Sequence, residues 1–265
     1  VTVLFEGKSF EVTTYRADGT YSDGRRPDEV SFSDTIEEDV RRRDFTINAM
    51  ALDMESMRVV DIFGGLEDME RRLIRAVGDP LERFLEDGLR PLRACRFAGK
   101  LGFAIEPATF AAIGGALDVF RQVAAERVRE ELMKIMEVPK PSVSLEAMRK
   151  SGLLEIVLPE LVAGYGVEQN EFHKYDVYHH NLKSCDAAPA DQPVIRFAAL
   201  LHDIGKVQAR ENSLRRNPEG DAVFYNHEMI GMRMADRIMR RLRFSNSDRQ
   251  LVTHLIQHHM FHYTD

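Results

Sequence analysis

The chain has few cysteines, no long apolar run and no excess of positive charge. Only Cys95 and Cys185 occur among 265 residues, far apart, so we expect two small buried core residues, no disulfide framework and a reducing cytosol. No apolar run is long enough to span a bilayer, so no membrane partner is expected. A net charge of −7 argues against a surface coated with positive charge for nucleic acid, although a local basic track could still bind RNA.

What is present is an ordinary globular composition, with 44% hydrophobic and 30% charged residues, and a length that allows two or three compact units. Apolar residues alternate around Glu6-Gly7-Lys8 and predict a β-hairpin. The spacing of Thr35 and Glu38 predicts a helix start with a capping box. Patterns further along predict short strands at 59–63 and 74–77 and a helix at 66–73.

Strand signals almost vanish after Pro80, where helices are predicted at 84–101, 107–117, 124–136 and 145–151. All nine histidines lie at or after His173, which marks a change in composition. We therefore expect an α+β fold that is mainly α. Its parts are a sheet remnant over 1–78, a helical neck over 79–165 and a helical, histidine-rich domain over 166–265.

Asp87 and Arg90 are three residues apart on the predicted helix 84–101 and so share one side of it. A carboxylate accepts hydrogen bonds and a guanidinium donates them. Cytosine and adenine both place an amine donor beside a ring-nitrogen acceptor, which this pair complements, whereas uracil and guanine place a carbonyl where the amine should be. The pair therefore predicts selection of C and A.

Arg93 and Arg96 continue the same stripe, and two guanidiniums at that spacing can clamp a triphosphate. Arg43, from a second charged segment, could bind the same phosphates or a ribose. The alternative for the stripe is an intrahelical ladder of salt bridges, which the spacing alone does not separate from a binding site.

These residues fall in segments that resemble a known family, the class II tRNA nucleotidyltransferases and their poly(A) polymerase relatives, within the DNA polymerase β superfamily. The resemblance lies in EEDVRRRDFTINAMALD, VDIFGGLEDM and RFLEDGLRPLRACRFAGKLGF, and extends to ERVREELMKI and SGLLEIVLPEL. It implies that Asp87 and Arg90 act as the base-reading template and that Arg43, Arg93 and Arg96 bind the nucleotide. Gly88 and Pro91 depart from the family pattern, so the functional helix is expected to begin near Leu89.

The resemblance also implies two Mg²⁺ ions held by an Asp-x-Asp, which this chain does not contain. We expect that segment to precede Val1, so the chain as given should bind nucleotides without polymerising them. Glu11 is a candidate third carboxylate, and the alternative is a solvent-facing strand glutamate. The loop from Gly24 to Phe32 resembles the family's element for switching from C to A addition, unless Arg25 and Arg26 are simple loop charges.

The segment FAALLHDIGK places His202 and Asp203 directly after an apolar run. His180 lies upstream and His227 and His259 lie downstream, an order that resembles the HD superfamily of metal-dependent phosphohydrolases. Imidazoles with a carboxylate suit a divalent metal that activates water toward a phosphoester. His179, His254, His258 and His262 are expected at the surface, although the spacing of His254 and His258 could mimic a metal site. A metal-free domain used for shape or dimerisation is the alternative.

Together these patterns predict an enzyme that adds CMP and AMP from CTP and ATP to the 3′ end of tRNA, in the cytoplasm, and carries an HD domain. A poly(A) polymerase is the close alternative, and an HD phosphohydrolase with a nucleotide-binding but non-catalytic head is another. The segment from Arg237 to Phe244 is the best candidate for contact with the tRNA backbone, against the alternative of a solvated helix face.

Overall fold

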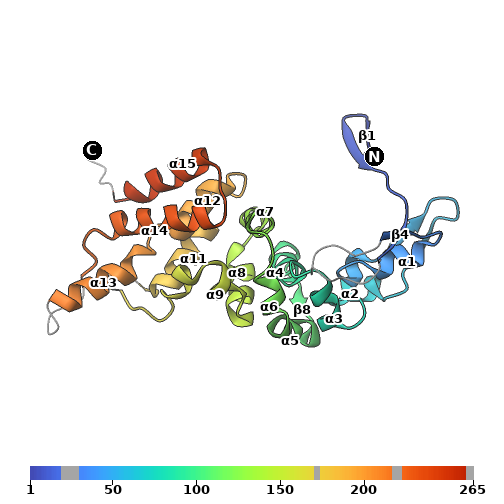
Figure 1. Cartoon of the computed structure of the whole chain (residues 1–265), viewed down its shortest axis with the longest axis horizontal. Coiled ribbons are helices and arrows are strands. Elements are labelled where there is room, and N and C mark those ends of the chain that lie inside the picture. The colour runs from blue at the N-terminus through green and yellow to red at the C-terminus, as the bar shows by residue number, and fades with distance from the viewer. Residues whose placement is uncertain (19–29, 170–173, 217–222, 261–265) are drawn as a thin grey trace. The chain divides into compact units, whose positions relative to one another are not determined.

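The computed structural model describes residues 1–18, 30–169, 174–216 and 223–260 (Figure 1). It is mainly helical and divides into two compact units. Unit 1 comprises residues 1–90 and 104–122, and unit 2 comprises residues 91–103 and 123–265. The mainly-α fold is therefore confirmed, whereas the three expected domain ranges follow different bounds from these units and stay a prediction.

Unit 1 carries every strand that the structure describes, all in two-stranded pairs. Its elements are β1 (Thr2–Phe5), β2 (Lys8–Glu11), β3 (Arg16–Asp18), β4 (Val30–Phe32), α1 (Ile36–Arg41), a 3-10 turn (Thr46–Asn48), β5 (Ala51–Asp53), β6 (Arg58–Val60), α2 (Gly65–Arg71), β7 (Leu73–Ile74), α3 (Pro80–Glu86), β8 (Ala104–Ile105), α5 (Pro107–Gly115) and α6 (Leu117–Phe120). The pairs β1–β2, β3–β4 and β5–β6 are antiparallel, and β7–β8 is parallel.

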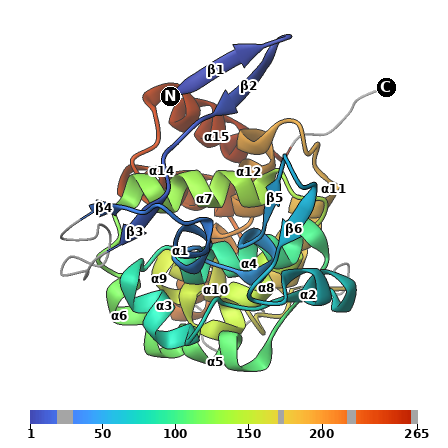
Figure 2. The same cartoon turned by 90° about the vertical axis from the view of Figure 1, so that its right-hand side faces the viewer.

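The predicted N-terminal hairpin is confirmed as β1 and β2, with Phe5 opposite Lys8 (Figure 2). Glu6 and Gly7 both have positive φ angles, of 48° and 75°, which is the conformation that a two-residue hairpin turn requires. The predicted helix start at Thr35 is also confirmed, because α1 begins at Ile36. The capping box is not formed, since the Thr35 side chain makes no bond to the helix.

The single helix predicted over 84–101 is wrong. The chain forms α3 up to Glu86 and then α4 (Arg90–Leu101), and Asp87 between them is extended, with φ −140° and ψ 106°. Asp87 accepts the Leu89 N–H on Oδ1 at 3.0 Å and the Arg90 N–H on its carbonyl oxygen at 3.0 Å. This local turn competes with helix continuation, and Pro91 then fits the first turn of α4.

Unit 2 is helical throughout its described residues. Besides α4 from Pro91 onward, its elements are α7 (Ala125–Met136), α8 (Pro141–Ser151), α9 (Leu153–Val157), α10 (Pro159–Val162), α11 (Val177–Ala187), α12 (Pro193–Leu201), α13 (Gly205–Arg216), α14 (His227–Arg241) and α15 (Asn246–Gln257). Within this unit α12 packs on α7, α11 and α15, and α14 packs on α13 and α15 (Figure 1).

One buried cation joins several helices of unit 2. The Arg196 side chain on α12 is 2% exposed and lies where α7 and α11 end. Its guanidinium donates to the carbonyl oxygens of Met136, Val138, Pro139, Cys185 and Asp186. The last carbonyls of a helix lack partners within the helix, so one buried arginine satisfies groups that would otherwise be orphaned.

Candidate metal centre and nucleotide-binding residues

Four helix ends bring four histidines of unit 2 to one place. His180 lies in the first turn of α11, which Asp176 caps by accepting the His179 N–H at 2.7 Å. His202 is the C-terminal cap of α12, and Asp203 follows it. His227 begins α14, and His259 follows the end of α15. Helix ends therefore concentrate these side chains at one side of the four-helix packing.

A close approach of two backbones holds His227 near Asp203. A Cβ added to Gly205, at the start of α13, would overlap the His227 carbonyl oxygen and lie 2.5 Å from the Gly231 amide nitrogen. Only glycine at position 205 therefore permits α13 and α14 to pack this closely. The glycine of the HDIGK segment thus has a packing role in building the centre.

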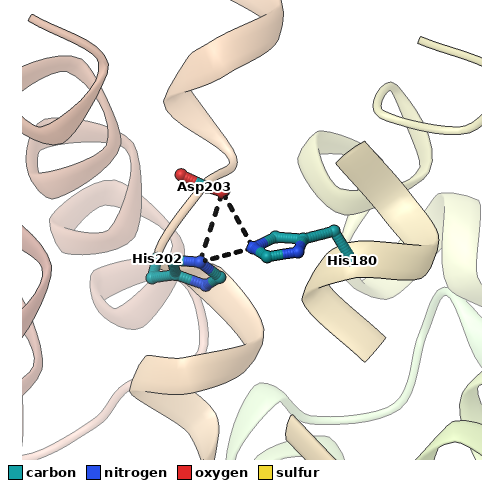
Figure 3. Close-up of side chains that lie close together, drawn as sticks. All are labelled: His180, His202 and Asp203. Atoms are coloured by element: carbon teal, nitrogen blue, oxygen red, sulfur yellow. Dashed lines mark hydrogen bonds and ion pairs between the residues drawn. The ribbon is translucent and has the colours of Figure 1, made fainter. Parts of the chain in front are cut away.

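Figure 3 shows His180 reaching from α11 toward His202 and Asp203. His180 Nε2 lies 3.1 Å from His202 Nε2, and both nitrogens lie 3.2 Å from Asp203 Oδ2. On the other side of the carboxylate, Oδ1 lies 3.3 Å from His227 Nε2 and 3.5 Å from His259 Nε2. His227 Nε2 and His259 Nε2 are 3.2 Å apart. The four predicted histidine ligands therefore surround the fifth predicted ligand, Asp203.

The tautomers of three histidines follow from their backbone contacts. Nδ1 of His202, His227 and His259 each lies 2.7 to 2.9 Å from the carbonyl oxygen of the residue three positions earlier. A carbonyl only accepts, so Nδ1 carries a hydrogen and Nε2 of the neutral ring is an acceptor. Facing Nε2 acceptors need a cation or a proton between them, which is the arrangement of metal-binding imidazoles.

Asp203 is 2% exposed, and Oδ1 has no hydrogen-bond partner of acceptable geometry among the described residues. Burial alone would raise the pKa of Asp203, but contacts with four imidazoles outweigh it and hold the pKa well below its usual range. Burial would lower the pKa of His259, but its bond to Asp203 raises it. Protons and a divalent cation therefore compete for the same Nε2 lone pairs.

The donors form two groups of three that share Asp203, namely His180 with His202 and His227 with His259. Imidazole nitrogens with a carboxylate suit borderline transition metals. An orphaned buried oxygen and facing acceptors fit such an ion, so these residues could hold one or two divalent cations. The buried Lys206, whose Nζ lies 2.7 Å from Asp203 Oδ2, adds a positive charge beside the first group.

The other described histidines are not among these donor groups. His179 Nδ1 is 2.8 Å from Asp176 Oδ1, and His254 and His258 are exposed on or just after α15, with ring centroids 4.6 Å apart. His173 and His262 lie outside the described residues.

The predicted site residues of unit 1 are the catalytic candidate Glu11 and the nucleotide-binding candidates Arg43, Asp87 and Arg90. Glu11 ends the exposed strand β2, and Arg43 Nη2 forms an ion pair with Asp39 at 3.0 Å. Asp87 and Arg90 do not share a helix face as predicted, because Asp87 precedes α4.

The Arg90 guanidinium is 8% exposed and firmly held. It bonds to Glu86 Oε2, at 2.5 Å, and to the carbonyl oxygens of Arg83 and Arg42, at 2.8 and 3.0 Å. These bonds use three of its five N–H groups.

Arg93 and Arg96 belong to unit 2 and meet a buried carboxylate there. Arg96 Nε donates to Glu131 Oε2 at 2.6 Å, and Arg93 Nη1 lies 3.8 Å from Glu131 Oε1. Lys134 Nζ donates to the same Oε1 at 3.0 Å, and both guanidiniums lie over the Phe97 ring. Arg90 thus forms an ion pair with a residue of α3 and Arg96 with a residue of α7.

The basic segment from Arg237 to Phe244 is partly neutralised within unit 2. Arg240 pairs with Asp236, Arg241 with Glu160 and Arg243 with Glu126. The predicted switching loop from Gly24 to Phe32, with Arg25 and Arg26, lies mainly outside the described residues.

Sequence reasoning missed Glu131 and Lys206. The position of Lys206, one helical turn after Asp203 in HDIGK, is a signal that could have identified it. Glu131 lies in the ERVREELMKI segment, where nothing in its spacing distinguished it from the neighbouring surface charges.

Three family models match the chain. They are described as "Poly A polymerase head domain" over residues 1–75, "Probable RNA and SrmB- binding site of polymerase A" over 102–164 and "HD domain" over 170–264. Among the described residues, no helix is long and apolar enough to cross a membrane.

Similar proteins carry related names. The chain is 47% identical over 153 residues to a CCA-adding enzyme of Levilactobacillus brevis, a match that covers 58% of this chain and 38% of the relative. It is 35% identical over 250 residues to an A-adding tRNA nucleotidyltransferase of Deinococcus radiodurans, covering 88% and 54%. The crystal structure of the Bacillus stearothermophilus CCA-adding enzyme in complex with CTP matches with a TM-score of 0.59 and 26% identity, covering 96% and 65%.

The chain thus spans between about a third and about half of the length of these curated relatives. The matched head, RNA-binding and HD models, together with the named relatives, show that this chain belongs to the class II CCA-adding enzyme family.

Proposed function

We propose that the chain selects nucleotides for a template-independent enzyme that transfers CMP and AMP from CTP and ATP to the 3′ hydroxyl of tRNA in the cytoplasm, with Mg²⁺. The observation that carries the proposal is the segment holding Asp87 and Arg90, which lies in the 250-residue match to an A-adding tRNA nucleotidyltransferase. In the transfer, the tRNA 3′ oxygen bonds to the α-phosphorus, the bond to the bridging oxygen breaks and pyrophosphate leaves.

The fixing of Arg90 supports its role as a base reader. Because Glu86 and two carbonyl oxygens hold the guanidinium, it can meet a ring nitrogen without first losing rotational freedom. The Asp87 carboxylate, just before α4, would accept the amine of cytosine or adenine. The same pair would reject uracil and guanine, whose carbonyl oxygens would face the carboxylate.

The test is incorporation of each NTP, alone and in combination, into a tRNA that lacks its 3′ end, using the gene product that contains this sequence. We expect addition of C and then A, stopping after three nucleotides. Asp87→Ala should remove the discrimination against U and G while triphosphate binding is retained, and Asp118→Ala, at an exposed position, should change neither. Discrimination that survives in Asp87→Ala would disprove the base-reading role.

A poly(A) polymerase is a second candidate, which the head-domain match favours. An unlimited A tail in the same experiment would identify it, and no addition of any nucleotide would leave the head as a binding platform.

We also propose that unit 2 carries a metal-dependent phosphohydrolase. The observation that carries this proposal is the convergence of four imidazoles on Asp203. A bound divalent cation would supply a water nucleophile at neutral pH. Hydrolysis would form a bond between a water oxygen and phosphorus, break the bond from phosphorus to the ester oxygen and transfer a proton to that ester oxygen. Backbone carbonyl oxygens orient the rings of His202, His227 and His259 by accepting hydrogen bonds from Nδ1. The Lys206 ammonium would pair with a phosphate oxygen.

Metal stoichiometry tests this centre. Titration with Zn²⁺ should give two equivalents for the wild-type chain and one each for His180→Ala and His259→Ala. Asp203→Ala should lose both, together with phosphatase activity, while nucleotide addition by the gene product is retained. His179→Ala, next to His180 but outside the cluster, is the matched control and should retain both ions. Unchanged stoichiometry in Asp203→Ala would reject the site.

A further inference from the structure

A cavity of about 360 Å³ lies beside the candidate metal centre in unit 2. Its walls come from α11, α12 and α15. Among the described residues, the lining is nearly all apolar side chain and imidazole, with one serine hydroxyl. Its aliphatic walls are formed by Ile195, Ala198, Ala199 and Leu255. A volume of this size lies in the range of roughly 300–1,000 Å³ that is typical of small-molecule sites.

Two imidazoles belong to both the cavity and the metal centre. His202 and His259 line the cavity, and their Nε2 atoms face His180 and His227, respectively. Their rings meet edge to face, with centroids 5.2 Å apart and an angle of 86° between the planes. A molecule whose phosphate lies at Asp203 could therefore place an adjoining group in this cavity.

The chemistry of the lining limits what that group can be. Among the described residues, no Lys, Arg, Asp or Glu side chain lines the cavity, so a charged or strongly hydroxylated group would lose its water without compensation there. The exposed rings of His254 and His258 form the rim, with centroids 4.6 Å apart. Imidazole faces and aliphatic walls favour a flat aromatic group.

We propose that this cavity is the subsite for the flat aromatic group of a phosphoester that the HD centre hydrolyses. The inference rests on the phosphohydrolase function proposed above and specifies its substrate class: esters of phosphate with an aryl or heteroaryl group near the ester oxygen. An aliphatic ester such as glycerol 2-phosphate leaves the cavity unfilled. The cavity therefore sets selectivity, while Asp203 and its histidines perform the chemistry.

The experiment compares wild type with Ala199→Leu, which adds three carbons to the cavity wall. Ala187→Leu, the same change at an exposed position of α11, is the matched control. Three readouts are taken on Zn²⁺-loaded chains: hydrolysis of phenyl phosphate, hydrolysis of glycerol 2-phosphate, and calorimetric binding of phenylphosphonate, which cannot be hydrolysed. Zinc stoichiometry and circular dichroism of each variant establish that the centre and the fold are retained.

We expect Ala199→Leu to lower kcat/KM for phenyl phosphate and the affinity for phenylphosphonate at least tenfold, with glycerol 2-phosphate hydrolysis unchanged. Ala187→Leu should match wild type throughout. Phenylphosphonate binding should also shift the ring-proton resonances of His254 and His258. Should Ala199→Leu leave phenyl phosphate unaffected, or slow both esters equally, the subsite is disproved while the phosphohydrolase stands. Hydrolysis of neither ester by the wild-type chain would overturn both.

Discussion

The arginine-rich segments and the histidine centre use charge in opposite ways. In the first group the carboxylates meet side chains that are already cationic: Asp39 pairs with Arg42 and Arg43, and Glu131 pairs with Arg96 and Lys134. In the histidine centre, one carboxylate, that of Asp203, meets four imidazoles and an ammonium. An arginine that is already paired must exchange or share its partner when a phosphate arrives. The facing imidazole nitrogens instead accept a cation without breaking an ion pair.

The largest effect is expected at the backbone contact between α13 and α14, which supports the histidine centre. Gly205→Ala should destabilise the chain by about 3 kcal/mol or more, since the added Cβ collides with main-chain atoms of α14 that cannot rotate away. Urea unfolding and zinc titration measure the loss of stability and of the metal centre. Gly114→Ala is the matched control, because its Cβ meets nothing within 4 Å and alanine favours the helix. Equal stability of the two variants would contradict the contact.

Removal of the buried carboxylate should have the next largest effect. Glu131→Gln leaves Arg96 buried without its ionic partner and should cost about 3 kcal/mol in the free energy of unfolding at pH 7. Arg96→Met in the same chain should recover part of the loss. Recovery absent from the double variant would show that the two side chains are not coupled.

The same pair predicts a pH dependence. Burial would raise the pKa of Glu131, but the hydrogen bond from Lys134 and the charge of Arg96 outweigh it and lower the pKa below its ordinary value of 4.5. Its stabilising contribution is therefore complete above pH 4.5 and is lost as the pH falls through the folded-state value. The difference in unfolding free energy between wild type and Glu131→Gln should shrink below pH 4.5, and a constant difference would contradict the ion pair.

A smaller effect is expected from the cation of the histidine centre. Lys206→Met should raise Zn²⁺ affinity roughly tenfold at pH 7.5, about 1.4 kcal/mol, because it removes a positive charge 2.7 Å from a metal-binding oxygen. Chelator competition measures the affinity, and Lys183→Met, at an exposed position of α11, should leave it unchanged. Weaker binding by Lys206→Met would mean that the ammonium supports the site rather than opposing the metal.

The smallest effect should come from an exposed pair. Arg71 Nη2 lies 2.6 Å from Glu67 Oε1, but both side chains are more than half exposed, at 65% and 57%. Glu67→Gln should change the free energy of unfolding by less than about 0.5 kcal/mol. Thermal denaturation at two salt concentrations measures this stability change. A loss as large as that of Glu131→Gln would show that burial does not explain the difference between the two ion pairs.

The sequence predicted the parts of the molecule that depend on local pattern. Periodicity located α7 and α5 to within a few residues, and the HDIGK segment with its flanking histidines identified side chains that the fold brings together. Gly88 and Pro91 indicated a helix start near Leu89, close to the observed start of α4 at Arg90. Periodicity alone missed the break, because the Asp87 turn depends on backbone bonds that a periodicity count does not include. Nor did the sequence predict Glu131, whose importance arises only when α4 and α7 bury it between two guanidiniums.

The five carbonyl oxygens around Arg196 limit how this protein can be cut. A fragment beginning at residue 166 would keep all the predicted metal ligands and the arginine, but would lose the acceptors of Met136, Val138 and Pro139. A buried guanidinium left with two of five acceptors is costly. Proteolysis that separates the neck from the histidine-rich segment should therefore yield an unstable piece, and the neck helices from Val123 onward form part of any phosphohydrolase fragment that folds by itself.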